Sequence, residues 1–236
     1  MNSLRDLQKY TISKDFFEVF KHTEKKTDNH VNSVGKMKNT PHSFPLEKGV
    51  QSNPSYKSLF WTFYSLINNE HMTSMIEHHK FKIKNDFSLN FVSLIKNNKA
   101  FLKQNKLKFH DIESSILYNN DINLDTLKAL VLFNKMNVCY IWNNKYYIFE
   151  SNDDDTFHVI KRMRETFTFN RNVTKQYIME NEGSKKILMD NTRTQLKSVS
   201  SYKLEDLKQM ALMLDIDVNI HKTKSQLYNE INRKID

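Results

Sequence analysis

The sequence predicts an α+β protein: a mixed helical domain with a small antiparallel β-hairpin or meander, followed by a C-terminal two-helix module. Three observations predict it. Apolar residues recur at helical spacing over 56–133, form short aromatic and β-branched runs over 137–161, and return to helical spacing after residue 201. We therefore expect four parts: a mostly disordered arm with a possible short N-terminal helix (1–55), a core domain (56–164), a connector (165–200) and the module (201–236).

The helical part of the core begins where aromatic residues become dense, at Tyr56. Residues 59–67 are apolar on most sides, which predicts a helix buried in the core. Further apolar stripes predict an amphipathic helix over 87–102 and a shorter one over 112–117. Asn123 is a suitable N-cap for a helix over 124–133. In the arm, by contrast, only residues 4–20 have helical spacing.

The strand signal is strongest over 137–150. Two aromatic and β-branched runs there are separated by Asn143-Asn144, and asparagine tolerates the positive φ that a tight hairpin turn demands. After an acidic turn over 151–155, residues 157–161 are expected to add the third strand of a meander. The polar residues of 165–200 are expected to form a connector with one helix.

The C-terminal module is predicted from two matching stripes. Leu204, Leu207, Ala211 and Leu214 define one helix face, and Leu227, Ile231 and Ile235 define another. Thr223 followed three residues later by Gln226 is a capping-box signature for the second helix. The two helices would enclose a minimal core, with Ile216 filling the gap between them.

The strings YKLEDLK (202–208) and KTKSQLY (222–228), with Leu214 and Ile216 between them, resemble the SAP motif and the related Rho N-terminal helix-extension-helix. Members of these families commonly bind DNA or RNA through the start of the second helix and the loop before it. The resemblance implies phosphate contact by His221, Lys222 and Lys224. Asp215 stands where such modules often have glycine, and residues 200–236 hold six basic and six acidic side chains. A protein-docking module is therefore the alternative.

The charge of the whole chain favours a polyanionic partner. Its formal net charge is +9, and a field of that sign attracts nucleic acid or an anionic membrane surface. Most of the basic residues are lysines, which contact phosphates more readily than they read base edges. Residues 80–108 hold eight lysines and one acidic residue, Asp86. We expect one helical face there to carry four ammonium groups: Lys96, Lys99, Lys103 and Lys106. A merely solvated face is the alternative.

The sequence offers weak signals for catalysis. Ser74 stands three residues before Glu77, so His71, His78 and His79 complete no zinc-binding helix motif. Cys139 is the single cysteine, and alternation in its strand predicts a packed thiol. The order of elements faintly resembles papain-like ovarian-tumour-type deubiquitinases, but Leu59 stands where such enzymes need cysteine. We expect no enzymatic activity, no cofactor and no metal.

A secretory core and an apolar run long enough to span a membrane are both lacking, so we expect an intracellular protein without a membrane partner.

The segment SLFWTFY (58–64), the hairpin and the module, in this order, resemble a protein type of nucleocytoplasmic large DNA viruses. That resemblance implies host cytoplasm, a viral factory or the virion. The leading hypothesis is DNA binding through phosphate contacts. The alternative is a virion or assembly scaffold whose C-terminal module docks onto a viral protein.

Overall fold

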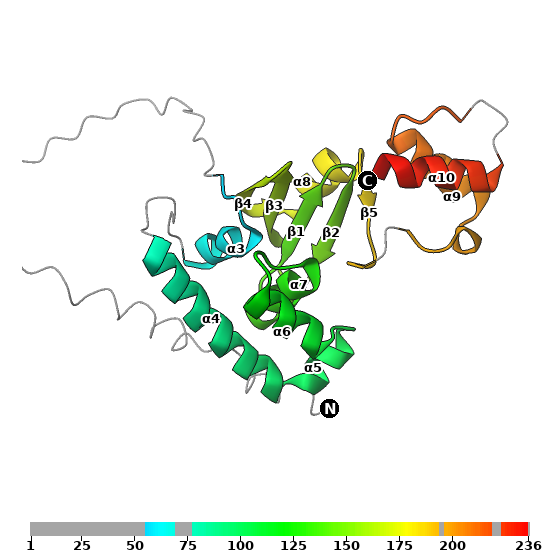
Figure 1. Ribbon diagram of the computed structural model, residues 1–236. Helices are drawn as coiled ribbons and strands as arrows, with labels where there is room; N and C mark the ends of the chain where they lie inside the picture. The colour runs from blue at the N-terminus through cyan, green and yellow to red at the C-terminus, as the bar shows by residue number, and fades with distance from the viewer. Residues whose placement is uncertain (1–54, 69–76, 194–195, 219–222, 236) are drawn as a thin grey trace, which may run out of the picture. The chain divides into compact units, whose positions relative to one another are not determined.

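A mixed five-stranded sheet is the centre of the part of the chain that the computed structural model describes, which is residues 55–68, 77–193, 196–218 and 223–235 (Figure 1). These residues belong to one unit, 53–236. The α+β class is confirmed. The predicted arm, including its helix over 4–20, lies outside the described residues except for Ser55.

The helices that precede the sheet are α3 (Leu59–Asn68), α4 (Glu77–Asn97), α5 (Lys99–Gln104), α6 (Phe109–Tyr118) and α7 (Leu124–Phe133). The strands are β1 (Val138–Trp142), β2 (Lys145–Phe149), β3 (Thr156–Met163), β4 (Thr166–Thr174) and β5 (Ile187–Leu188). Between β4 and β5 lie α8 (Lys175–Ile178) and the π-helical turn η3 (Met179–Gly183). The 3₁₀ turn η4 (Val199–Ser201), α9 (Leu204–Met213) and α10 (Lys224–Ile235) complete the described chain.

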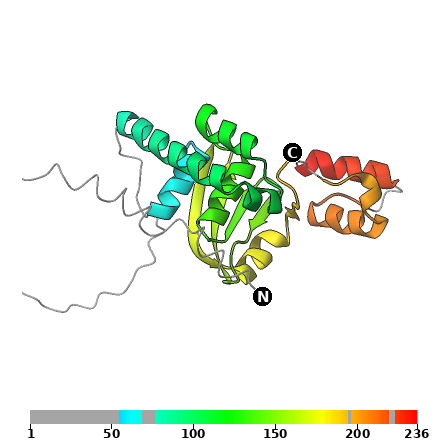
Figure 2. The ribbon, with the colours of Figure 1, turned by 90° about the horizontal axis from the view of Figure 1, so that it is seen from below.

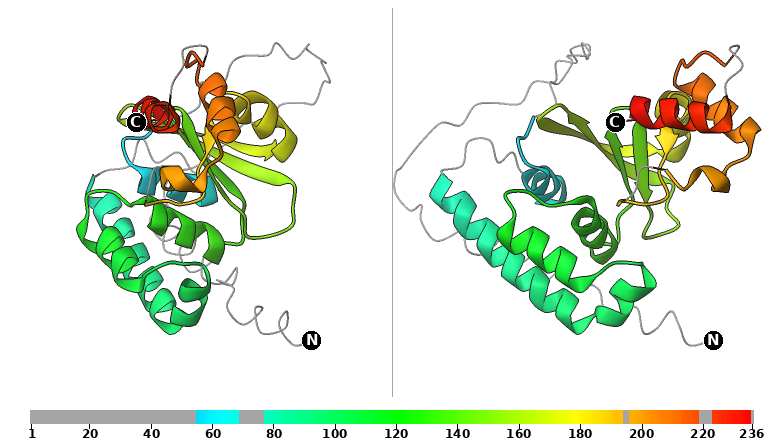
Figure 3. Two further views of the ribbon diagram at one scale, coloured as in Figure 1. Left: turned by 90° about the vertical axis from the view of Figure 1, so that its right-hand side faces the viewer. Right: turned by 45° about the vertical axis from the view of Figure 1, so that its right-hand side comes forward.

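The sheet has the strand order β4-β3-β1-β2-β5 and is covered on both faces. On one face, Ile178 of α8 packs with a cluster from β1, β2 and β3 that includes Cys139, Ile141 and Phe157. On the other face α3 contacts β4, and α7 contacts β2. Figure 2 shows the strands between the α3–α7 helices and α8. In both views of Figure 3, α4 and α6 lie side by side, in agreement with their contacts.

The predicted hairpin is confirmed. β1 and β2 pair antiparallel, with Trp142 opposite Lys145, and Asn143 in the connecting turn has φ 52°. The third strand exists, but the meander is wrong: β3 lies on the other side of β1 and pairs with it in parallel. The small sheet is therefore mixed rather than antiparallel.

The side chain of Asn137, which is buried, holds the loop that makes this crossing possible. Its Nδ2 donates to Asn152 Oδ1 and to the Asp154 carbonyl, each at 2.7 Å, and its Oδ1 accepts from Ser151 N at 2.8 Å. The loop is thereby bound across the start of β1. These hydrogen bonds join residues 14 to 17 positions apart, so the hydrophobic spacing of the sequence did not predict them.

The connector prediction for 165–200 differs from the structure, which places the longest strand of the sheet there. Phe167 and Phe169 of β4 are buried, and their neighbours Thr166 and Thr168 are half-buried, so TFTF is a period-two pattern. α8 and η3 follow β4, and β5 then pairs in parallel with β2. The core domain therefore continues past residue 164, the end that we predicted for it.

The C-terminal helices agree with the prediction. α9 and α10 pack on each other, and Leu207, Ala211, Leu214, Leu227, Ile231 and Ile235 are buried. The capping box is present: Thr223 N donates to Gln226 Oε1 at 2.8 Å, and Gln226 N donates to Thr223 Oγ1 at 3.3 Å. Ile216 is half-buried at the start of the link.

α9 ends in a left-handed residue that is not glycine. Asp215 has φ 54°, its N–H donates to the Leu212 carbonyl at 3.1 Å, and Ile216 N donates to the Ala211 carbonyl at 2.9 Å. This pair of bonds is the Schellman motif, whose left-handed position is usually glycine. The departure from the SAP pattern at Asp215 thus preserves the backbone geometry.

Replacing Asp215 with glycine is expected to raise the free energy of unfolding of the module by about 1 kcal/mol, because glycine has no Cβ to clash in the left-handed region. Urea unfolding followed by circular dichroism measures the change. As a control, Lys208→Gly, in the exposed interior of α9, is expected to lower the same quantity by about 1 kcal/mol. Equal destabilisation by both glycines would contradict the left-handed assignment.

Candidate nucleic-acid interface

The predicted lysine face is divided between two helices. Asn98 is buried with φ −121° and ψ 34°, and its Nδ2 donates to the Leu94 carbonyl at 2.8 Å, so α4 ends and α5 begins around it. Lys96 lies in the last turn of α4, Lys99 and Lys103 lie in α5, and Lys106 lies in the turn after it. The prediction of one continuous helical face is therefore wrong, because the helix breaks at Asn98.

The ammonium groups of this segment are exposed and uncompensated. We define the lysine surface as Lys96, Lys99, Lys103, Lys106 and Lys108, all of which are exposed. Within the described ranges, none of the five forms an ion pair with a carboxylate. Lys99 Nζ lies 4.9 Å from the centroid of the Phe109 ring, which fixes its direction. The positive charge of this surface is therefore not neutralised by a described carboxylate.

Lys106 is held by the backbone at the end of α5. It has φ 59°, its N–H donates to the Lys103 carbonyl at 3.1 Å, and Leu107 N donates to the Leu102 carbonyl at 2.9 Å. Leu107 is buried, so the turn is anchored in the core. This second Schellman-type turn places the Lys106 side chain beside α7 rather than along α4.

Lys128 of α7 is the neighbour that the sequence analysis missed. Its Nζ donates to the Asn105 carbonyl at 3.1 Å. Burial lowers the pKa of Lys128, and the charge of Lys106 lowers it further, while Asp125 opposes both. The signal available in the sequence was a single lysine that follows Asp125 and Thr126 in a mostly apolar helix, LDTLKALVLF. Lys106 and Lys128 therefore line the same region of the structure.

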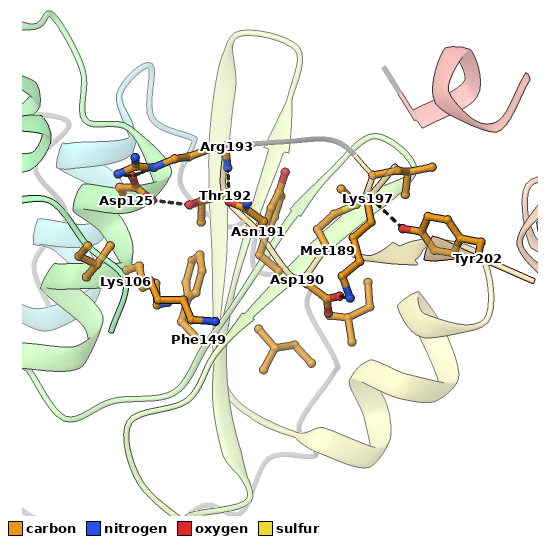
Figure 4. A pocket seen from close by; sticks show the side chains of 16 residues that line it. Lys106, Asp125, Phe149, Met189, Asp190, Asn191, Thr192, Arg193, Lys197 and Tyr202 are labelled. Carbon is orange, nitrogen blue, oxygen red and sulfur yellow. Dashed lines mark hydrogen bonds and ion pairs between the residues drawn. The ribbon is translucent and has the colours of Figure 1, made fainter. Parts of the chain in front are cut away.

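That region is a cavity of about 390 Å³, bounded by Lys106 and Leu107, α7, β2 and the segment 188–193 (Figure 4). Asp125 on its wall is buried, and it accepts from Arg193 Nε at 2.7 Å and from the Thr192 hydroxyl. Arg193 also pairs with Asp111 at 2.9 Å. Opposite them, Lys197 pairs with Asp190. The cavity therefore contains structural ion pairs as well as Lys106 and Lys128.

The module contributes one described residue to the predicted site. Lys224 is the first residue of α10 and is half-buried. His221 and Lys222 lie outside the described residues. Between residues 201 and 235, the described side chains comprise five basic and five acidic groups, so this part of the module is neutral, as the whole of 200–236 is.

The groups weighed for catalysis lie apart from the lysine surface. Cys139 is fully buried in β1, and burial raises the pKa of its thiol to about 12. The packed thiol is confirmed. His71 lies outside the described residues, and His78 and His79 are exposed near the start of α4. In the ranges that the structure covers, no group of three His, Cys, Asp or Glu residues could hold a metal ion.

Cys139 is expected to be unreactive toward a thiol-specific reagent such as 5,5′-dithiobis(2-nitrobenzoic acid) in the native protein at pH 8, because the thiol is buried and protonated. In 6 M urea it is expected to react fully within minutes. Absorbance of the released thiolate follows both reactions. A native rate close to that of the unfolded protein would contradict the buried position.

The N-terminus of α3, where a papain-like nucleophile would lie, is capped by Asp121. Its carboxylate accepts from Leu59 N at 2.7 Å, from Phe60 N at 3.0 Å and from the Ser58 hydroxyl at 2.8 Å. It also accepts from Ile122 N at 2.9 Å. These donors are therefore occupied within the protein itself.

Among the described helices, none is long and apolar enough to cross a membrane. The chain matches no protein-family model and has no significant similarity to a curated protein or to a solved structure.

Proposed function

We propose that the protein binds nucleic acid, DNA in the first place, through phosphate contacts made by the lysine surface. The observation that carries the proposal is the five exposed ammonium groups that have no carboxylate partner in the described parts of the chain. Lysines that only solvate a surface commonly lie beside acids; here the segment 80–108 holds one acid, Asp86. A phosphate backbone supplies the missing counter-charge.

The chemistry of these residues supports backbone contact rather than sequence reading. Lysine is a point charge without the planar fork that pairs with guanine in the major groove. The lysine surface contains no arginine. We therefore expect affinity that depends weakly on sequence and strongly on salt.

Fluorescence anisotropy with a labelled 20-base-pair duplex tests the proposal. If each of the five lysines meets one phosphate, the logarithm of the binding constant falls with the logarithm of salt concentration with a slope of about −4.5. Affinity should then fall roughly 500-fold between 50 and 200 mM salt. Absence of binding at 50 mM salt, or tight binding that does not depend on salt, would defeat the proposal.

The helix-extension-helix supports the same function through its SAP-like sequence, with His221, Lys222 and Lys224 as the implied contacts. The capping box occupies the N–H groups of Thr223 and Gln226, so the proposed phosphate contacts of the module are side-chain contacts. A viral-factory or virion setting stays a prediction, which rests on the sequence resemblance alone.

A non-catalytic role is part of the proposal. The inert Cys139 thiol and the capped N-terminus of α3 both support it, because a cysteine hydrolase needs an accessible thiolate and free donors for an oxyanion.

A scaffold function is the second candidate, favoured by the module. Its described charges balance, and Leu212 on α9 has 59% of its surface exposed. An exposed leucine on a module whose described charges balance suits protein docking. A protein partner that is still captured after nuclease treatment, and by a Lys222→Glu/Lys224→Glu variant, would favour this function over DNA binding.

A further inference from the structure

The cavity beside Lys106 has a polar side and an apolar side. Its volume of about 390 Å³ lies within the range of small-ligand sites. Part of its lining is apolar or aromatic, which suits a flat ring: Leu107, Tyr147, Ile148, Phe149, Leu188 and Met189. Figure 4 shows Lys106 and Asp125 on the helical side and the segment from Met189 to Arg193 crossing the view.

The lining holds four cations and two carboxylates, and Asp111, from outside the lining, adds a second carboxylate partner to Arg193. The cations are Lys106, Lys128, Arg193 and Lys197, and the anions are Asp125 and Asp190. Arg193 binds Asp125 at 2.6 Å, and Lys197 binds Asp190 at 2.5 Å. Lys106 and Lys128 are therefore the two cations that neither carboxylate neutralises by direct contact.

The Lys128 ammonium has capacity for a ligand. It has three N–H donors, and one of them is used by the Asn105 carbonyl. Burial disfavours its charged form, Asp125 favours it and Lys106 disfavours it less strongly, and the net effect is a lowered pKa. An anion placed between the two lysines would offset the effects of burial and of Lys106, whereas a cationic or neutral ligand would not.

We infer that this cavity binds a phosphate monoester carried on a nucleotide, with the phosphate between Lys106 and Lys128 and the nucleoside against the apolar lining. A phosphate monoester carries a charge of about −1.5 to −2 at neutral pH and can interact with both Lys106 and Lys128, which form no ion pair with a described carboxylate. The nucleotide is either free or the phosphorylated end of a strand. Only the second source rests on the proposed nucleic-acid binding.

The test uses the full chain, adenosine 5′-monophosphate in isothermal titration calorimetry, and two otherwise identical labelled oligonucleotides that end in a 5′-phosphate or a 5′-hydroxyl. We expect either measurable nucleotide binding or about tenfold tighter binding of the phosphorylated oligonucleotide. Lys128→Met is expected to abolish that signal while affinity for the hydroxyl end changes less than twofold. Lys106→Gly, which suits the left-handed backbone, is the second variant and should act in the same direction.

Lys103→Met is the control, because it removes an exposed lysine outside the cavity lining. It should weaken both oligonucleotides equally and keep the preference for the phosphate. Equal affinity for both ends together with no nucleotide binding overturns the cavity inference and leaves the lysine surface intact. Nucleotide binding that Lys128→Met removes, without any oligonucleotide binding, supports the cavity and defeats the proposed function alone.

Discussion

Replacing Asp121 with alanine is expected to lower the free energy of unfolding by about 3 kcal/mol. The carboxylate satisfies two backbone N–H groups at the start of α3, the Ser58 hydroxyl and its own neighbour Ile122 N. Removing it leaves four donors without this acceptor, beside a helix that is buried along most of its length. Urea unfolding followed by tryptophan fluorescence measures the loss, since Trp61 lies in α3.

Asp121→Asn separates the contribution of the hydrogen bonds to stability from the contribution of the charge. The amide keeps one acceptor oxygen and loses the favourable charge at the helix N-terminus, so about half of the alanine effect is expected. Asp86→Ala, on α4, serves as a surface control and should change stability by less than about 0.5 kcal/mol. If Asp121→Ala resembled this control, the cap would have no structural role.

Asn137→Ala is expected to have the second large effect, a loss of about 3 kcal/mol. The amide is 2% exposed and joins the start of β1 to three residues of the loop before β3. Without it, buried partners lose their hydrogen bonds, and the crossing that places β3 beside β1 loses its anchor. Thermal unfolding and amide hydrogen exchange of β3 measure the two consequences.

Asn90→Ala is the matched control for Asn137, because Asn90 is exposed on α4 and makes no side-chain hydrogen bond to the described residues. It should leave stability within about 0.5 kcal/mol of the wild type. Unchanged hydrogen exchange of β3 in Asn137→Ala would contradict the role given to the loop.

Local patterns predicted the elements that depend on local chemistry. The hairpin follows from Asn143-Asn144, α7 from the Asn123 cap, which accepts from Thr126 N at 2.8 Å, and α10 from the Thr223–Gln226 box. The loop that leads to β3 is bound by Asn137, whose partners lie 14 to 17 residues away. No spacing rule contains that information.

The arrangement of the candidate lysines was predicted in part for the same reason. Charge density located the lysines of 96–106, but the break at Asn98 depends on a buried amide that bonds back to Leu94. Lys128 joins Lys106 only because α5 and α7 meet at the Asn105 carbonyl. The chain has three glycines, and in the described residues lysine, asparagine, arginine and aspartate occupy the left-handed positions, so glycine did not mark them.

We propose that phosphate binding belongs to the lysine surface and not to the net charge of +9 alone. Two triple variants that lose the same charge test it: Lys96→Gln/Lys99→Gln/Lys103→Gln on the surface, and Lys57→Gln/Lys135→Gln/Lys185→Gln at exposed positions elsewhere. In anisotropy titrations at 100 mM salt, the first should bind duplex DNA about 100-fold more weakly than the wild type and the second less than about fivefold more weakly. Equal losses in the two variants would contradict the claim.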